Sequence, residues 1–349
     1  MVLRQHTCFG KCTCQFIPPI VTSNLSKSGV EAARTSSLES QRQRARRTQK
    51  DISVTLLAMA QTGQSLRQVY DCQSKWVQRV KLIREEGAAA ITDPVANQVY
   101  DSVGIVREFF KTVLGRNSID NLGLNLVLNV HFGKKYMNAF WDGDEMTFGD
   151  GDGKIFTNFA QSLDVIAHEL AHGVTQYTAN LEYKNQSGAL NESFSDVFGS
   201  AITQYAKGET ADTADWLIGD EIMGPELYGE ALRSMKDPGT AYDNALMGKD
   251  PQPAHMKDYY TGAEDNGGVH INSGIPNKAF YLTAMDIGTD KAVQIWYAGL
   301  LRLTATADFN MAASALVEAA RVLVRDGKVP VGSPQVVRSA FRAVGIPIV

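Results

Sequence analysis

Apolar positions recur at helical spacing along most of the second half of the chain, whereas the first half mixes helical and strand-like patterns. An amphipathic helix is predicted near 95–114, and the partly alternating run at 124–130 predicts a sheet strand. Later apolar spacing predicts helices over 190–206, 275–286, 290–304, 309–325 and 334–343. The pattern therefore predicts an α+β fold, with a β-containing N-terminal lobe, a helical C-terminal lobe and an active-site cleft between them.

A further helix is predicted just before the two lobes meet, near residues 180–190. Ser162 precedes an apolar-periodic pattern that runs through Tyr177, and Asp164 carries a negative charge favourable in a first helical turn. Asn180 can adopt the left-handed conformation that ends a helix. Because glycine and aspartate alternate at 149–153, a tight loop is expected ahead of this helix.

The first 50 residues differ in composition from the rest. They carry nine Lys or Arg against two Glu, a net charge of +7. The remaining 299 residues carry a net charge of −11, which gives the overall value of −4. We therefore expect a basic segment over 1–50, which we call the head, an N-terminal α/β lobe over 51–185 and a helical C-terminal lobe over 186–349. A basic head can bind nucleic acid or membrane. Its arginine run at 42–47 has no interleaved aromatic residues, so complementing the acidic body of its own chain is favoured, and no nucleic-acid partner is expected.

Composition excludes several classes of protein. With 349 residues and 44% hydrophobic content the chain has globular statistics, and no apolar run is long enough for a membrane span. The N-terminus lacks the apolar core of a standard signal peptide, so cytoplasmic residence and leaderless release both stay open. Cys8, Cys12 and Cys14 lie in the head and one further cysteine in the body. Their spacing is not a standard zinc pattern; reduced surface thiols are favoured over a thiolate that caps a catalytic zinc.

The central chemical signal is the pentapeptide His168-Glu169-Leu170-Ala171-His172. Helix residues four apart lie about 40° apart around the axis and about 6 Å along it, so both imidazoles can reach one ion at about 2.1 Å. Glu169 lies beside that ion and can take a proton from bound water. The alternative is a buried helix whose two histidines have only structural hydrogen bonds.

A downstream acidic pair favours the metal interpretation. Glu192 and Asp196 lie four residues apart on the next predicted helix, so one carboxylate can complete the site while the other reaches an imidazole nitrogen from outside. Two His and one Glu leave a fourth position for water, as a zinc hydrolase requires.

Spacing separates the classes of zinc peptidase. The metzincin extension requires Gly and His where this chain has Thr175 and Thr178, so that class is excluded. Nineteen residues separate His172 from Glu192, whereas one-metal aminopeptidases typically have eighteen, which would place their glutamate at Asn191. An aminopeptidase also needs an acidic anchor for a free N-terminus, and no such motif is visible. A zinc-binding protein without activity stays a further alternative.

The stretch from His168 through Thr175, with Tyr183 to Glu192, resembles the signature of the thermolysin family of neutral metalloendopeptidases, and the likeness extends over about residues 95–349. The short head with Phe16-Ile17-Pro18-Pro19 resembles the protealysin branch, which has a short propeptide. The resemblance implies a proenzyme whose head covers the cleft and is cleaved between about Arg47 and Thr62.

The same resemblance implies roles for individual residues. Tyr183 and His270, the latter held by Asp265, would face the oxyanion of the intermediate, and Arg233 would bind a substrate carbonyl. Asp196 would orient His168, with Asn191 beside it as a second outer contact of the metal ligands. The implied substrate-binding residues are Asn138, Ala139 and Trp141 on an edge strand and Phe156, Val165 and Leu232 in a pocket after the scissile bond.

Taken together, these features predict a zinc-dependent endopeptidase that cuts proteins before bulky hydrophobic residues. One catalytic Zn²⁺ is expected, held by His168, His172 and Glu192. The family's paired calcium site lacks carboxylates at Ser200 and Thr203, so at most one weakly bound Ca²⁺ stays open. The expected partners are protein or peptide substrates, the chain's own head and a protein inhibitor; we expect a monomer.

Overall fold

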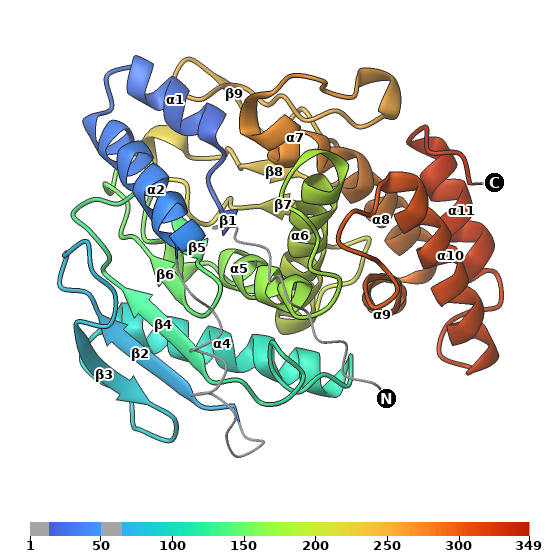
Figure 1. Cartoon of the computed structure of the whole chain (residues 1–349), viewed down its shortest axis with the longest axis horizontal. Coiled ribbons are helices and arrows are strands. Elements are labelled where there is room, and N and C mark those ends of the chain that lie inside the picture. Colours follow the sequence, from blue (N-terminus) through green and yellow to red (C-terminus); the bar gives the residue numbers. More distant parts are fainter. Residues whose placement is uncertain (1–13, 50–64, 349) are drawn as a thin grey trace.

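The structure is a computed structural model that describes residues 14–49 and 65–348 (Figure 1). Cys8, Cys12 and most of the expected processing segment lie outside these ranges. The described strands are β1 (Cys14–Gln15), β2 (Arg67–Asp71), β3 (Lys81–Glu85), β4 (Leu126–Val130), β5 (Ala139–Trp141), β6 (Met146–Phe148), β7 (Leu217–Ile218), β8 (Arg233–Ser234), β9 (Asp243–Asn244) and β10 (Gly248–Lys249). The α-helices are α1 (Pro19–Lys27), α2 (Glu31–Gln49), α4 (Pro94–Thr112), α5 (Leu163–Gln176), α6 (Asn185–Lys207), α7 (Glu264–Asn272), α8 (Gly274–Ile287), α9 (Thr289–Leu300), α10 (Phe309–Arg325) and α11 (Ser333–Ala343).

A six-stranded mixed sheet forms the N-terminal lobe, in the order β1-β5-β6-β4-β2-β3. The predicted strand β4 lies inside this sheet, parallel to both β2 and β6, and all five of its residues are buried. Burial on both faces explains why its apolar alternation is incomplete in the sequence. Helix α4 packs on β2 and β4 and also contacts α5, so it joins the sheet to the centre of the molecule.

Helices α5 and α6 form the centre and pack more extensively on each other than any other pair of elements described (Figure 1). Helix α5 begins at Leu163, as predicted, and ends at Gln176, one residue before the predicted end. Asn180 has the expected left-handed backbone, with φ of 50°, but it lies three residues beyond the C-cap Tyr177 and so does not end the helix. Helix α6 begins at Asn185, five residues earlier than predicted, and therefore brings the acidic pair of the sequence analysis alongside α5.

The C-terminal lobe is helical, as predicted. Helix α6 contacts α7, α8 and α9, while α10 packs on α9 and α11 on the side away from the sheet (Figure 1). The observed α9 ends at Leu300, four residues before the predicted limit. The mixed-sheet lobe and the helical lobe confirm the predicted fold class; the exact division at 51–185 and 186–349 stays a prediction. Among the described residues, the helices that are long enough to cross a membrane are too polar to do so.

The described part of the head is folded onto the body rather than separate from it. Strand β1 extends the sheet at its β5 edge, and α1 and α2 lie above it (Figure 1). The ion pairs of Arg42 and Arg46 go to Glu39 within the head, and the expectation that the basic head complements the acidic body stays a prediction. Cys14 is buried, so the interpretation as a surface thiol is wrong for this residue.

Candidate active site

The two histidines and the distant glutamate of the sequence motif converge between α5 and α6. The Nε2 atoms of His168 and His172 lie 3.0 Å apart, and each lies 3.5 Å from a different oxygen of Glu192. All three side chains are buried, and their ligand atoms lie within 4.8 Å of one another. The chain therefore brings two imidazoles and one carboxylate to a single point, although nineteen residues separate the last two in sequence.

Buried oxygens around this point fit a metal ion and its water. Among the described residues, Glu192 Oε2 and both carboxylate oxygens of Glu169 are buried without a hydrogen-bond partner. Burying a carboxylate oxygen without a hydrogen-bond partner costs free energy of folding. A dication held by His168, His172 and Glu192 would satisfy the first oxygen directly, and a water beside it would satisfy Glu169. The residues present thus fit the expected zinc site.

Burial also sets the basicity of Glu169. It raises the pKa of the Glu169 carboxyl to about 8, because the charged form is poorly solvated, while the charge of His168 acts in the opposite direction. A dication at the neighbouring ligands would lower that pKa by charge attraction. The carboxylate is therefore placed where it can exchange a proton with a group held in front of it.

Outer contacts fix the ring orientations of both histidines. His168 Nδ1 lies 2.9 Å from Asp196 Oδ1, and His172 Nδ1 lies 2.8 Å from Asn191 Oδ1. Each outward nitrogen is thereby engaged, which leaves the Nε2 atoms facing the metal position. Ser195, which the sequence analysis missed, also approaches His172 Nδ1 at 3.1 Å.

Asp196 is the centre of a buried polar network. Arg233 donates two hydrogen bonds of 2.8 Å to its two oxygens, and Asn277, also missed, donates a third of 2.9 Å. Burial raises the pKa of Asp196, but Arg233 and His168 outweigh this and hold it at about 2. The carboxylate therefore stays charged while it fixes the His168 ring.

A second group of donors lies across the metal position. Asp265 accepts hydrogen bonds from the His270 backbone N–H and ring Nδ1, at 2.8 and 2.7 Å, which leaves His270 Nε2 turned inward. The Tyr183 hydroxyl lies 3.2 Å from that nitrogen and donates to Glu192. Asp265 belongs to a run of four residues with left-handed backbone that ends at Gly268. Sustained left-handed conformation is rare, and the helical pattern gave no signal for it.

The head occupies the place where a cleft was expected. Phe16 N donates to Ala139 O at 3.1 Å, and Ile17 N donates to the Asn138 side chain at 2.9 Å. The Phe16 ring is fully buried, meets the His168 ring edge-on with centroids 5.1 Å apart, and lies under the guanidinium of Arg233. Residues 15–17 thus lie along strand β5 beside the metal position.

The remaining predicted pocket residues lie inside the body. Leu232 and Phe16 both lie next to Gly219, where a side chain on that glycine would collide with them. Phe156 and Val165 are fully buried. The Trp141 ring points inward and donates its indole N–H to Gln176 at 3.1 Å, so the contribution of this residue to the edge is its backbone in β5.

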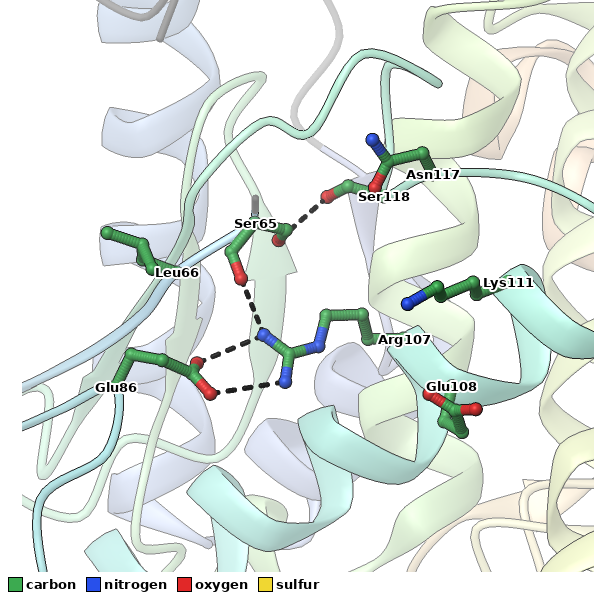
Figure 2. Close-up of a pocket in the computed structure, with 8 residues that line it drawn as sticks. All are labelled: Ser65, Leu66, Glu86, Arg107, Glu108, Lys111, Asn117 and Ser118. Atoms are coloured by element: carbon green, nitrogen blue, oxygen red, sulfur yellow. Dashed lines mark hydrogen bonds and ion pairs between the residues drawn. The ribbon is translucent and has the colours of Figure 1, made fainter. Parts of the chain in front are cut away.

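Other polar groups lie outside the set of His168, His172 and Glu192. Asp164 accepts hydrogen bonds from Ser162 and from the backbone of Val165 and Gly219, and burial followed by the charge of Asp164 raises the pKa of Asp220 to about 6. Asp164 and Asp220 are among the carboxylates left to hold one weakly bound Ca²⁺, which stays an expectation. A separate pocket of about 240 Å³ shares no residue with the histidine group (Figure 2); it is lined by Ser65, Leu66, Glu86, Arg107, Glu108, Lys111, Asn117 and Ser118. In that pocket, Arg107 is held by Glu86 and the carbonyl of Ser65.

Family models match nearly the whole described chain. The model described as the thermolysin metallopeptidase catalytic domain matches residues 34–176, and the thermolysin metallopeptidase alpha-helical domain matches residues 179–346. The chain belongs to the thermolysin family. It is a zinc metalloendopeptidase at the level of that family, and His168, His172 and Glu192 form a group suited to binding a metal ion.

Individual relatives place the chain in the protealysin-like branch. It is 50% identical over 254 residues to an extracellular metalloprotease of Pectobacterium carotovorum, covering 71% of this chain and 73% of that one. Identity to thermolysin of Alicyclobacillus acidocaldarius is 42% over 265 residues, 73% of this chain but only 46% of that relative. The structure of the protealysin precursor from Serratia proteamaculans matches with a TM-score of 0.84 and 43% identity, covering 95% of this chain and 99% of that one.

Proposed function

We propose that this chain is the precursor of a zinc endopeptidase, kept inactive by its head and released by cleavage between about Arg47 and Thr62. The observation that carries the proposal is the position of residues 15–17, which lie on the edge strand β5 as an extended substrate would. The precursor structure of protealysin, similar over 95% of this chain, supports it.

The proposed chemistry assigns one task to each group. Zinc, when bound, would lower the pKa of a water molecule so that it can lose a proton near neutral pH, and would polarise the carbonyl that is attacked. Glu169 takes the proton from the attacking water and passes it to the leaving amine. Tyr183 and His270 donate hydrogen bonds to the negative oxygen that develops on the attacked carbon. Asp265 keeps the His270 ring in the orientation for this donation.

Substrate would be held by the groups that hold the head. Ala139 O and the Asn138 side chain pair with the substrate backbone, and Arg233 holds the carbonyl of the residue after the cut. The Phe16 ring fills an apolar position beside Leu232. We therefore propose cleavage before bulky apolar residues, with the residue after the cut taking the place of Phe16.

Mass spectrometry of the purified chain, incubated with zinc or with a chelator, tests this proposal. The zinc sample is expected to lose a fragment ending between residues 47 and 62 and then to cut an N-blocked peptide before Phe or Leu. The chelated sample is expected to do neither. A trimmed, zinc-loaded protein that has released its head and still leaves blocked peptides intact would contradict the proposed function and favour a zinc-binding protein without activity.

A further inference from the structure

One peptide bond of the head is surrounded by the groups proposed to act on substrate. The carbonyl oxygen of Gln15 lies 3.0 Å from His270 Nε2, and the Phe16 N–H on the other side of the bond donates to Ala139 O. The next carbonyl, that of Phe16, receives the guanidinium of Arg233 at 3.4 Å. If the proposed function is correct, Gln15–Phe16 is the bond presented for attack.

The side chain of Gln15, the residue before that bond, is held by other residues of the head. Gln15 is 3% exposed, and its amide N–H donates to the backbone carbonyl of Ser40 at 3.0 Å, while Arg44 donates to its amide oxygen. Both partners belong to α2, which follows Phe16 in the chain. The residue before the bond and the residues after it are therefore tied to the same helix.

Helix α2 is in turn tied to the N-terminal lobe. The Ser40 hydroxyl lies 3.0 Å from the Tyr136 hydroxyl, and the Met137 backbone N–H donates to Ser36 Oγ at 2.9 Å. Both lobe residues precede β5 by only a few positions. The helix is thus anchored close to the strand on which Gln15 and Phe16 lie.

We propose that Gln15–Phe16 is cut slowly within the head, and that Ser40 and Arg44 retain the Gln15 side afterwards, so that the head stays bound as an inhibitor. This inference rests on the proposed function. Hydrolysis adds one water: the amide C–N bond breaks, Gln15 gains a carboxylate and Phe16 an ammonium group. Neither new end is freed, because Gln15 is held through its side chain and Phe16 through the chain that leads into α2. An ordinary substrate lacks this second attachment and leaves after cleavage.

The test compares five forms of the full, zinc-loaded chain with the parent: Arg44→Ala, Gln15→Ala, the double variant, Arg44→Lys and Arg42→Ala. Arg42 is an exposed arginine on α2 that pairs with Glu39, so it is a matched control. Mass spectrometry follows fragments ending at Gln15 or beginning at Phe16, native mass spectrometry follows the bound head, and a blocked peptide reports activity.

Arg44→Ala is expected to release the fragment that ends at Gln15 about tenfold faster than the parent, as for loss of one charge-assisted hydrogen bond. Gln15→Ala, which also loses the hydrogen bond to Ser40, should release that fragment at least as fast. The double variant should be no faster than the faster single variant, because both changes remove the same contact. Arg42→Ala should match the parent, and Arg44→Lys, which keeps a donor, should stay close to it. Once the head is gone, all forms should have the same kcat/KM, since the changes lie on the removed fragment.

Two results would overturn the retention proposal while leaving the proposed function intact. The first is an active trimmed enzyme from which the fragment that ends at Gln15 leaves at the parental rate in both single variants. The second is a Gln15–Phe16 bond that stays intact in every form while the linker is cut. A trimmed enzyme without its head that has no activity would instead overturn the proposed function.

Discussion

Removing the Phe16 ring should open the active site of the untrimmed chain. The ring is fully buried between the His168 ring and the Arg233 guanidinium, with centroid distances of 5.1 and 5.0 Å. Replacing a buried Phe by Ala costs about 3–5 kcal/mol in protein cores. We take the lower value, about 3 kcal/mol, because the emptied pocket can fill with water. Since about 1.4 kcal/mol is tenfold, the population with the head displaced should rise about 100-fold.

The assay is the initial rate of blocked-peptide hydrolysis by zinc-loaded, full-length Phe16→Ala, with mass spectrometry to confirm that the chain is still untrimmed. The rate should rise about 100-fold over the parent. Leu38→Ala is the control, because Leu38 lies on α2 and is 50% exposed; its rate should not change. A Phe16→Ala protein that binds zinc, stays untrimmed and remains as inactive as the parent would refute the idea that this ring closes the site.

Three further outcomes follow from the site and from one distant histidine. Glu169→Ala should keep its zinc by metal analysis yet lose about 100- to 10,000-fold in kcat, the range for removal of a general base; turnover near the parent would contradict the role. Asp196→Asn should weaken zinc binding about 10- to 100-fold in a chelator competition, because the His168 ring loses its charged partner; unchanged affinity would contradict this. His131 lies 2.9 Å from Asp150, and this hydrogen bond, against the effect of burial, raises its pKa to about 9. Since the folded pKa lies above the ordinary value of about 6.5, protonated His131 stabilises the folded protein fully below pH 6.5, and this stabilisation is lost as pH rises to 9. Denaturant unfolding of the parent and of His131→Asn should therefore give free energies of unfolding that differ by about 1 kcal/mol at pH 6, a value reduced for the partial exposure of the ring. The difference should vanish above pH 9.

The sequence predicted the metal centre well because local patterns encode it. The α5 helix has its apolar positions at 3.6-residue spacing, so both its start and the shared face of His168 and His172 follow from the pattern alone. Glu192 could be added because it lies on a second periodic helix at a spacing that distinguishes peptidase classes. In contrast, Asn277 contacts Asp196 from α8, far along the chain, and no local signal relates the two residues.

The sequence predicted only part of the structure of the head, for a physical reason. Its second helix buries Ala33, Ser36, Ser40 and Gln43, which follow helical spacing but are small or polar. A method that looks for apolar periodicity cannot find such a face. Strand β1 has two residues and exists only through its pairing with β5, so tertiary structure, not propensity, creates it.

The proposed mechanism requires two imidazoles and one carboxylate to hold a single catalytic zinc. Zinc-edge X-ray absorption of the trimmed, one-zinc protein measures this ligand set directly. We expect nitrogen and oxygen neighbours at about 2.0–2.1 Å with imidazole scattering, and activity that disappears with the metal. A sulfur neighbour at about 2.3 Å would mean that cysteines bind the zinc, and would contradict the proposed ligand set of two His and one Glu.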